Sequence, residues 1–90
     1  MNSYEYEVIC KNALIAKLKE LYNEDLTIQD LHLVWFSKVL QNFKCIIIDL
    51  RPNKRMYECT YNGSKDELYL DIYNKEFNCL IPNKEFKKEV

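Results

Sequence analysis

The stretch YECTYNGSKDELYLDIY, residues 57–73, decides the fold of this chain. Its pair Asn62-Gly63, which holds the only glycine of the chain, separates two runs in which side-chain character alternates with a period of two. An Asn-Gly pair between two alternating runs is the strongest short-range signal for a β-hairpin. We therefore expect antiparallel strands at about residues 55–61 and 67–73.

The same alternation divides the side chains of this hairpin between two faces. One face is largely apolar and carries Tyr57, Cys59, Leu68, Leu70 and Ile72. The other face carries Glu58, Tyr69, Asp71 and Tyr73. A four-residue loop would set Cys59 opposite Leu68, and a two-residue loop would set Tyr57 opposite Leu68, but both registers keep the same faces together. We expect the apolar face to form the core and the other face to point away from it.

The N-terminal part of the chain predicts an amphipathic helix over about residues 3–22. Ser3 is a suitable N-cap, and acidic residues follow in the first turn, where the helix dipole favours them. Apolar residues recur at a spacing of three to four and form one wide stripe: Tyr4, Val8, Leu14, Ile15, Leu18, Leu21 and Tyr22. Lys11 is expected on or beside the polar side, and the apolar stripe is expected to pack on a sheet.

Three further runs are rich in β-branched or aromatic residues. They predict strands at about 31–38, 43–51 and 77–81. Pro82 would end the last of these, residues 52–54 read as a turn, and residues 83–90 form a charged tail with at most one helical turn. The predicted fold is α+β: a single domain, residues 1–90, with one N-terminal amphipathic helix packed on a four- or five-stranded antiparallel meander sheet.

Charge and hydropathy narrow the classes of partner. The 13 basic and 14 acidic residues leave a net charge of −1, which argues against a nucleic-acid partner, because phosphate binding needs a positive surface. No run of apolar residues is long enough to span a membrane. The chain also begins without a basic segment followed by an apolar block, so we expect no secretory signal and a cytoplasmic location.

The cysteines do not have the spacing of a metal site. Cys10, Cys45, Cys59 and Cys79 lie far apart, and no Cys-x-x-Cys pair occurs. A tetrahedral zinc site usually takes pairs of ligands two to four residues apart. We therefore expect no metal and no cofactor, and interpret the cysteines as buried thiols of a protein in a reducing compartment.

Two sets of residues are candidates for catalysis, and we favour a structural interpretation of both. Glu58 and Asp71 point to the same face of adjacent strands, as an acid–base pair would, but we favour a solvated face on which Lys or Arg side chains lie nearby. His32 is the only histidine, and a lone histidine is usually structural or on the surface. We expect no catalytic residues and no enzymatic activity.

The face that points away from the core is a candidate binding surface. Tyr69 and Tyr73 lie on it beside Glu58 and Asp71, and Trp35 can extend it. We call these five residues the partner surface. Exposed aromatic residues at this density are typical of interfaces, because Tyr and Trp contribute a large contact area at a low entropy cost. The alternatives are that the C-terminal segment or a second copy of the chain covers this face.

Residues in the central part of the chain carry a resemblance to a known family. They are Val34, Trp35, Ser37, Lys38, Leu40, Gln41, Asn42, Tyr57, Glu58, Thr60, Tyr61, Asn62, Gly63, Glu67, Tyr69, Asp71 and Tyr73. From about Leu31 to Tyr73 the chain resembles an uncharacterised family of small proteins encoded by bacteriophages and prophages of Gram-positive bacteria. The resemblance implies a bacterial host cytoplasm, no enzymatic activity and no catalytic residues.

Three functions are compatible with these observations. The first is a phage-type binding protein that inhibits a host defence or regulatory protein. The second is a homo-oligomer that sequesters a small signalling nucleotide, in which Tyr61 would stack on the base. Its ligand residues would be Ser37, Lys38, Gln41, Asn42, Tyr61 and Asn62. The third is a structural or assembly role, in which self-association, as a homodimer or a higher oligomer, buries the aromatic face.

Overall fold

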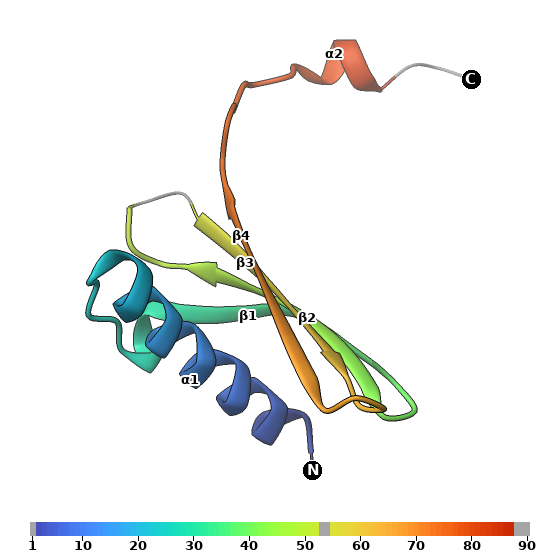
Figure 1. Cartoon of the computed structure of the whole chain (residues 1–90). Helices are drawn as coiled ribbons and strands as arrows, with labels where there is room; N and C mark the ends of the chain where they lie inside the picture. The colour runs from blue at the N-terminus through green and yellow to red at the C-terminus, as the bar shows by residue number, and fades with distance from the viewer. Residues whose placement is uncertain (1, 53–54, 88–90) are drawn as a thin grey trace.

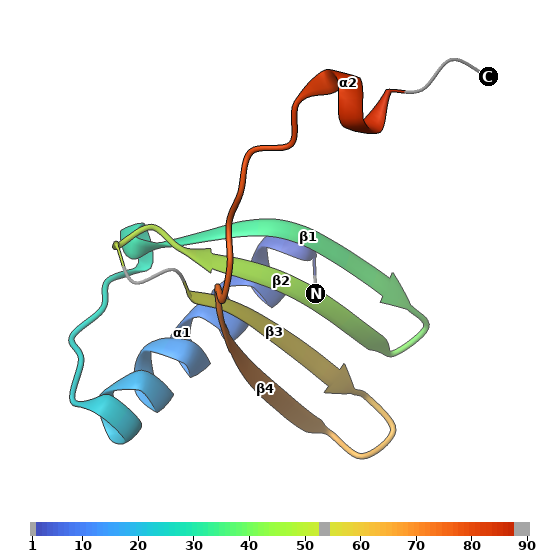
Figure 2. The same cartoon turned by 90° about the horizontal axis from the view of Figure 1, so that it is seen from above.

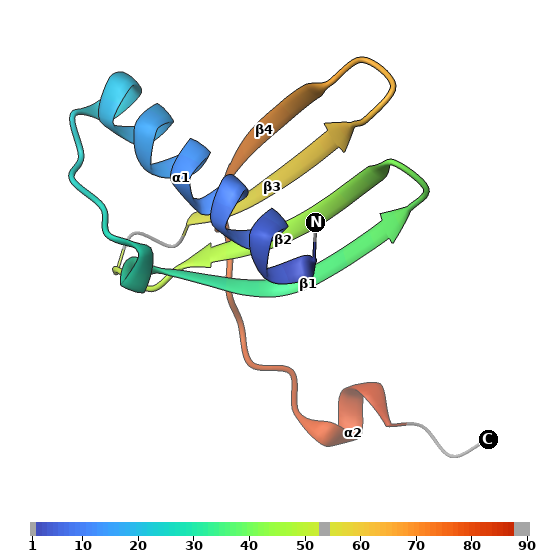
Figure 3. The same ribbon diagram turned by 90° about the horizontal axis from the view of Figure 1, so that it is seen from below.

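The computed structural model describes residues 2–52 and 55–87. Its elements are α1 (Ser3–Tyr22), the 3-10 helix η1 (Ile28–Asp30), β1 (Leu31–Val39), β2 (Asn42–Asp49), β3 (Arg55–Asn62), β4 (Glu67–Asn74) and α2 (Asn83–Phe86). The four strands form one antiparallel sheet in the order β1-β2-β3-β4, and α1 covers one of its faces (Figures 1 and 3). This arrangement confirms the predicted α+β fold. Residues 53–54 of the predicted turn and residues 88–90 of the predicted tail lie outside the described residues.

Helix α1 begins one residue earlier than the predicted cap implies. Asn2, rather than Ser3, is the N-cap, and its side-chain Oδ1 accepts a hydrogen bond from the amide of Glu5 over 2.9 Å. The helix ends at Asn23, which has a φ of 56°. Asparagine tolerates this left-handed conformation better than most residues, so it stops the helix without a glycine.

The buried stripe of α1 differs from the predicted one. Cys10, Leu14 and Leu18 are fully buried, and Lys11 is also buried, with its Nζ 2.7 Å from the Glu7 carboxylate. The predicted members Tyr4, Leu21 and Tyr22 are exposed. A helix of 20 residues is about 30 Å long, whereas four strands span only about 15 Å between the outermost strands. Residues near the ends of the helix therefore extend beyond the sheet.

The core lies between α1 and the inner face of the sheet. Its buried residues are Cys10, Leu14, Leu18, Leu26, Leu31, Phe43, Cys45, Ile47, Tyr57 and Cys59. Leu68, Leu70 and Ile72 of β4 pack against this core, as the alternation of the hairpin predicts. None of the helices within residues 2–52 and 55–87 has the length and apolar character needed to cross a bilayer.

The register of the β3–β4 hairpin differs from both predicted registers. Cys59 pairs with Leu70, and Asn62 pairs with Glu67, so the loop contains residues 63–66. In the register predicted for a four-residue loop, Cys59 faces Leu68, so the observed pairing is shifted from it by two residues. A shift of two residues keeps every side chain on its predicted face. Asp66, with a φ of 52°, provides the left-handed position of the loop, whereas Gly63 has no positive φ.

The predicted fifth strand at 77–81 is absent from the structure, as these residues have no regular secondary structure. A strand returning along β4 would need a tight turn through Lys75 and Glu76. A two-residue hairpin turn uses a left-handed residue, which Leu40 provides between β1 and β2, but neither Lys75 nor Glu76 adopts this conformation. The chain instead continues as an arm, residues 75–87, that leaves the sheet on the side opposite α1 (Figures 1 and 2). The radius of gyration is 16.2 Å, against about 12 Å for a compact domain of this length.

Candidate functional site

The second face of the sheet, which α1 does not cover, is the candidate site (Figure 2). Paired residues of neighbouring strands point to the same side, so the register assigns this outer face directly. It carries His32, Trp35, Ser37, Val39, Asn42, Lys44, Ile46, Ile48, Met56, Glu58, Thr60, Asn62, Glu67, Tyr69, Asp71 and Tyr73. One side of the sheet is thus packed, and the other consists of apolar, aromatic and charged side chains.

All five residues of the predicted partner surface lie on the outer face. Trp35, Glu58 and Asp71 belong to one row across the sheet, because Trp35 pairs with Ile46, which pairs with Glu58. The tyrosines lie in the rows on either side. Trp35 is 47% exposed, Tyr69 55% and Tyr73 45%. The structure therefore brings together the residues that the sequence singled out and leaves their rings accessible.

Two carboxylates stand opposite each other in the middle of this surface. Glu58 pairs directly with Asp71, an arrangement that is destabilising for like charges. Lys44 lies 3.1 Å from the Glu58 carboxylate. Asp71 is exposed and forms no ion pair with any other described residue. The outer face therefore has an acidic spot flanked by aromatic rings, and only one of its two carboxylates has a cation beside it.

The remaining polar contact on this part of the face orients a ring. The Tyr69 hydroxyl donates a hydrogen bond to the Glu67 carboxylate over 2.6 Å. This hydrogen bond raises the pKa of Tyr69, since the acceptor favours the protonated phenol. Tyr69 is therefore a neutral hydrogen-bonded ring, suited to contact rather than to proton transfer.

A hollow of about 340 Å³ lies beside Trp35. It is lined by Trp35, Ser37, Val39, Asn42, Phe43, Lys44, Thr60, Tyr61 and Asn62. Four of the six predicted ligand residues are among these, whereas Lys38 and Gln41 are not. The Lys38 ammonium donates to the carbonyl oxygen of Leu40, and the Gln41 amide nitrogen donates to the Ser64 hydroxyl over 2.7 Å. Both side chains are thus engaged in the hairpin loops.

Tyr61 occupies a different place from the one its predicted role requires. Its ring stacks on Phe43 with centroids 5.1 Å apart, within a cluster that also contains Tyr6 and Phe36. Its hydroxyl donates to Asp66 over 2.6 Å, and this hydrogen bond raises the pKa of Tyr61. The ring is already stacked on the helix side of the sheet, so Trp35 is the better platform for a planar ligand.

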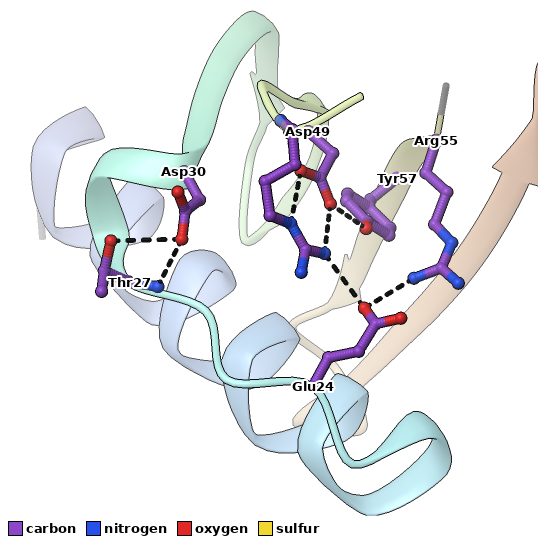
Figure 4. Close-up of polar contacts among 7 residues, drawn as sticks. Glu24, Thr27, Asp30, Asp49, Arg55 and Tyr57 are labelled. Carbon is purple, nitrogen blue, oxygen red and sulfur yellow. Dashed lines mark hydrogen bonds and ion pairs between the residues drawn. The ribbon is translucent and has the colours of Figure 1, made fainter. Parts of the chain in front are cut away.

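A polar network that the sequence did not reveal joins the end of α1 to the sheet (Figure 4). Asp49 is buried at the end of β2 and accepts a hydrogen bond from the Tyr57 hydroxyl over 2.6 Å. Arg51 donates to both carboxylate oxygens of Asp49, over 3.0 and 2.8 Å, and also to Glu24 over 3.0 Å. Arg55 donates to the same Glu24 oxygen over 2.8 Å.

This network shifts the pKa values of two of its members, Tyr57 and Glu24. Burial, together with the hydrogen bond to Asp49, raises the pKa of Tyr57 to about 12. The hydrogen bonds from Arg55 and Arg51 lower the pKa of Glu24. Each guanidinium is paired, so the network holds the chain in place. Its sequence signal was an acidic residue at the end of an apolar strand, followed closely by arginines.

Three cysteines that are distant in the sequence meet in the core. The Sγ atoms of Cys10, Cys45 and Cys59 all lie within 4.8 Å of one another, and Cys45 pairs with Cys59 across β2 and β3. This is close enough for three ligands of one thiophilic ion. Hydrogen bonds among the thiols, together with burial, raise the pKa of Cys10 and of Cys59, whereas those received from Cys10 and Cys59 lower the pKa of Cys45. All three side chains are fully buried among apolar residues, where neutral thiols pack well.

Comparison with known protein families identifies the family of this chain. A family model described as a family of unknown function (DUF6275) matches residues 7–83. The match spans most of α1, the whole sheet and most of the arm. No curated protein and no solved structure matches this chain.

Proposed function

We propose that this chain, which belongs to the family of unknown function DUF6275, is a binding protein that acts through its outer face and has no catalytic activity of its own. The observation that carries the proposal is the exposed group of Trp35, Tyr69 and Tyr73 around the carboxylates of Glu58 and Asp71. These residues lie on a rigid sheet whose other face is packed. They therefore present a preformed surface to a partner.

The chemistry of this surface indicates the kind of partner. Tyr and Trp side chains are enriched among the residues that contribute most to protein interfaces. The acidic spot favours a partner that brings a lysine or arginine to Asp71, because this would relieve the repulsion between the paired carboxylates. We therefore propose a protein partner with a basic side chain surrounded by apolar surface.

The biological setting follows from the resemblance to small phage and prophage proteins. We propose that the chain acts in the cytoplasm of a bacterial host and inhibits a host defence or regulatory protein. A domain of this size with an open, aromatic sheet face is suited to blocking a surface on a larger protein. The sequence resemblance and the exposed face support this setting together.

Binding to a host protein tests the proposal. The immobilised chain is exposed to host lysate, and the retained protein is identified, purified and titrated. Tyr69→Ala combined with Tyr73→Ala should weaken its affinity by about 30-fold or more, since truncating central interface residues costs at least about 2 kcal/mol. Tyr4→Ala combined with Leu21→Ala is the matched control, because these exposed residues lie on α1. Equal affinities of the two double variants would disprove the role of the outer face.

The hollow beside Trp35 favours one second candidate, the sequestration of a small nucleotide. Its volume of about 340 Å³ is within the range of small-molecule sites. Trp35 can stack on a base, Lys44 can face a phosphate, and Asn42 can accept or donate hydrogen bonds. A panel of cyclic nucleotides in a thermal-shift assay tests this function, because a ligand that binds only the folded chain raises its melting temperature. Trp35→Ala should abolish any shift, and a panel without a shift would exclude this candidate.

A further inference from the structure

The C-terminal arm, residues 75–87, carries large apolar side chains that lack cover. Phe77 is 79% exposed, Leu80 90%, Ile81 52% and Phe86 57%. Scattered apolar residues are normal on a surface, but four on one short segment that extends away from the domain are not. Figures 1 and 2 show this arm pointing away from both α1 and the sheet.

The arm also contains a segment that is suited to be a strand. Residues 77–81 read FNCLI, with apolar side chains on both faces of an extended chain, and Pro82 follows directly. A strand with two apolar faces is stable when it is covered or flanked on both sides. The structure leaves this segment extended and unpaired, although the sheet has two free edges, at β1 and at β4.

This segment pairs with neither edge of its own sheet. Pairing with β4 would need a tight turn at Lys75 and Glu76, which lack the conformations that such turns require. Pairing with β1 would carry the chain across the whole sheet, about 19 Å at four strand spacings. The residues from 75 to 77 span at most about 11 Å when fully extended. In the structure the segment pairs with neither edge of its own sheet, which leaves it free to pair with another molecule.

We propose that two copies of this chain exchange their arms, so that residues 77–81 of each copy add a fifth strand beside β1 of the other. β1 is favoured over β4 because three of its five exposed side chains are apolar, namely Val34, Trp35 and Val39. The outward side chains of β4 instead alternate between acidic residues and tyrosines. An apolar strand buries more apolar surface beside β1 than beside β4, and this burial favours pairing with β1.

The expected interface is large enough for a stable dimer. An aromatic side chain buries about 150–250 Å² when it is fully covered. Two phenylalanines from each of two arms, together with the surface that they cover, exceed about 1,000 Å², the lower limit for a specific interface. The exchange is symmetric, as in most homodimers. The exchange leaves the part of the outer face on β3 and β4 open. The exchange does not rest on the proposed function.

The mass of the full-length chain in solution tests the exchange. Light scattering at about 50 μM should give twice the chain mass of 10.9 kDa. Phe77→Ser combined with Leu80→Ser should give the monomer mass while the domain keeps its cooperative thermal unfolding, because these residues lie outside the core. Lys75→Ser combined with Lys84→Ser is the control and should remain dimeric. A monomeric natural chain, or a dimer that survives the Phe77 and Leu80 substitutions, would overturn the proposal.

Cys79 provides a direct test of the edge that is used, since it is the exposed cysteine of the arm. Val34→Cys places a second thiol on the β1 edge. Oxidised glutathione should then link this residue to Cys79 of the other copy, with the release of reduced glutathione, and peptide mapping identifies the bond. Glu67→Cys on β4 is the comparison variant. Linkage to residue 67 in place of residue 34, or linkage to neither, would disprove the pairing with β1.

Discussion

The amide nitrogen of Gly63 donates a hydrogen bond to the side-chain Oδ1 of Asn42 over 2.9 Å. This contact joins the loop after β3 to the start of β2, because the β1–β2 and β3–β4 turns lie at the same end of the sheet (Figure 2). Gln41 reinforces the contact through its hydrogen bond to Ser64. The two hairpins are therefore connected at their tips as well as along β2 and β3.

Gly63→Ala should destabilise the chain, although the φ of Gly63 is compatible with alanine. A β-carbon at this position would collide with the carbonyl oxygen and the side chain of Gln41. The backbone would have to move, which typically costs about 1–3 kcal/mol. Urea unfolding monitored by circular dichroism measures this loss. Lys65→Ala, in the same loop and exposed, should change the free energy of unfolding by less than about 0.5 kcal/mol.

Tyr57→Phe should alter the response of the chain to alkaline pH. Tyr57 has a folded pKa of about 12, against about 10 when unfolded. Between these values the unfolded chain releases a proton that the folded chain keeps, so the natural chain loses up to about 3 kcal/mol as the pH rises.

The phenylalanine variant lacks this loss, although it starts about 1 kcal/mol less stable at neutral pH for want of one hydrogen bond. Free energies of unfolding measured from about pH 9 to pH 12 should therefore converge and then cross, so that the natural chain is the less stable of the two near pH 12. If the free energies of unfolding of the two proteins instead change in parallel with pH, the assigned role of Tyr57 is wrong.

Glu24→Gln should lower stability at neutral pH and should have less effect in acid. The guanidinium groups of Arg55 and Arg51 hold the pKa of Glu24 below its ordinary value. The carboxylate therefore stabilises the fold above its unfolded pKa of about 4.3, and this contribution is lost as the pH falls through the lower folded pKa. Melting temperatures of the two proteins between about pH 7 and pH 3 provide the measurement. A constant difference over this range would show that the ion pairs contribute nothing to stability.

The thiols should react in two classes. Cys79 is exposed and should react rapidly with a disulfide reagent such as DTNB, whereas Cys10, Cys45 and Cys59 are buried. The native chain should therefore release one equivalent of thionitrobenzoate quickly, and the chain in guanidinium chloride should release four. Cys79→Ser should abolish the rapid phase. A rapid phase of more than one equivalent would show that the core opens readily.

Much of the candidate site followed from the sequence because strand alternation is a local property. The period-two pattern placed Glu58, Tyr69, Asp71 and Tyr73 on one face before any contact was known, and the structure finds them there. Lys38 and Gln41 could not be placed in this way. They lie at a hairpin loop, and their contacts depend on how the turn folds.

The polar network and the thiol cluster could not be predicted from the sequence, and the reason is related. Glu24 meets Arg51 and Arg55 only when the end of α1 comes to the sheet, and Asp49 meets Tyr57 only when β2 pairs with β3. Cys10 meets Cys45 and Cys59 only because α1 crosses the sheet at that point. Neither spacing nor composition reports such contacts between distant segments.

The sequence by itself thus determined the elements and the faces of the sheet, since hydrophobic periodicity and turn residues act over a few neighbouring positions. Only the tertiary structure decided the hairpin register, the buried stripe of α1 and whether residues 77–81 form a strand. Each of these three features depends on which other segment of the chain packs or pairs with it. A segment with strand-forming residues becomes a strand only where it pairs with an edge, and residues 77–81 pair with no edge of their own sheet.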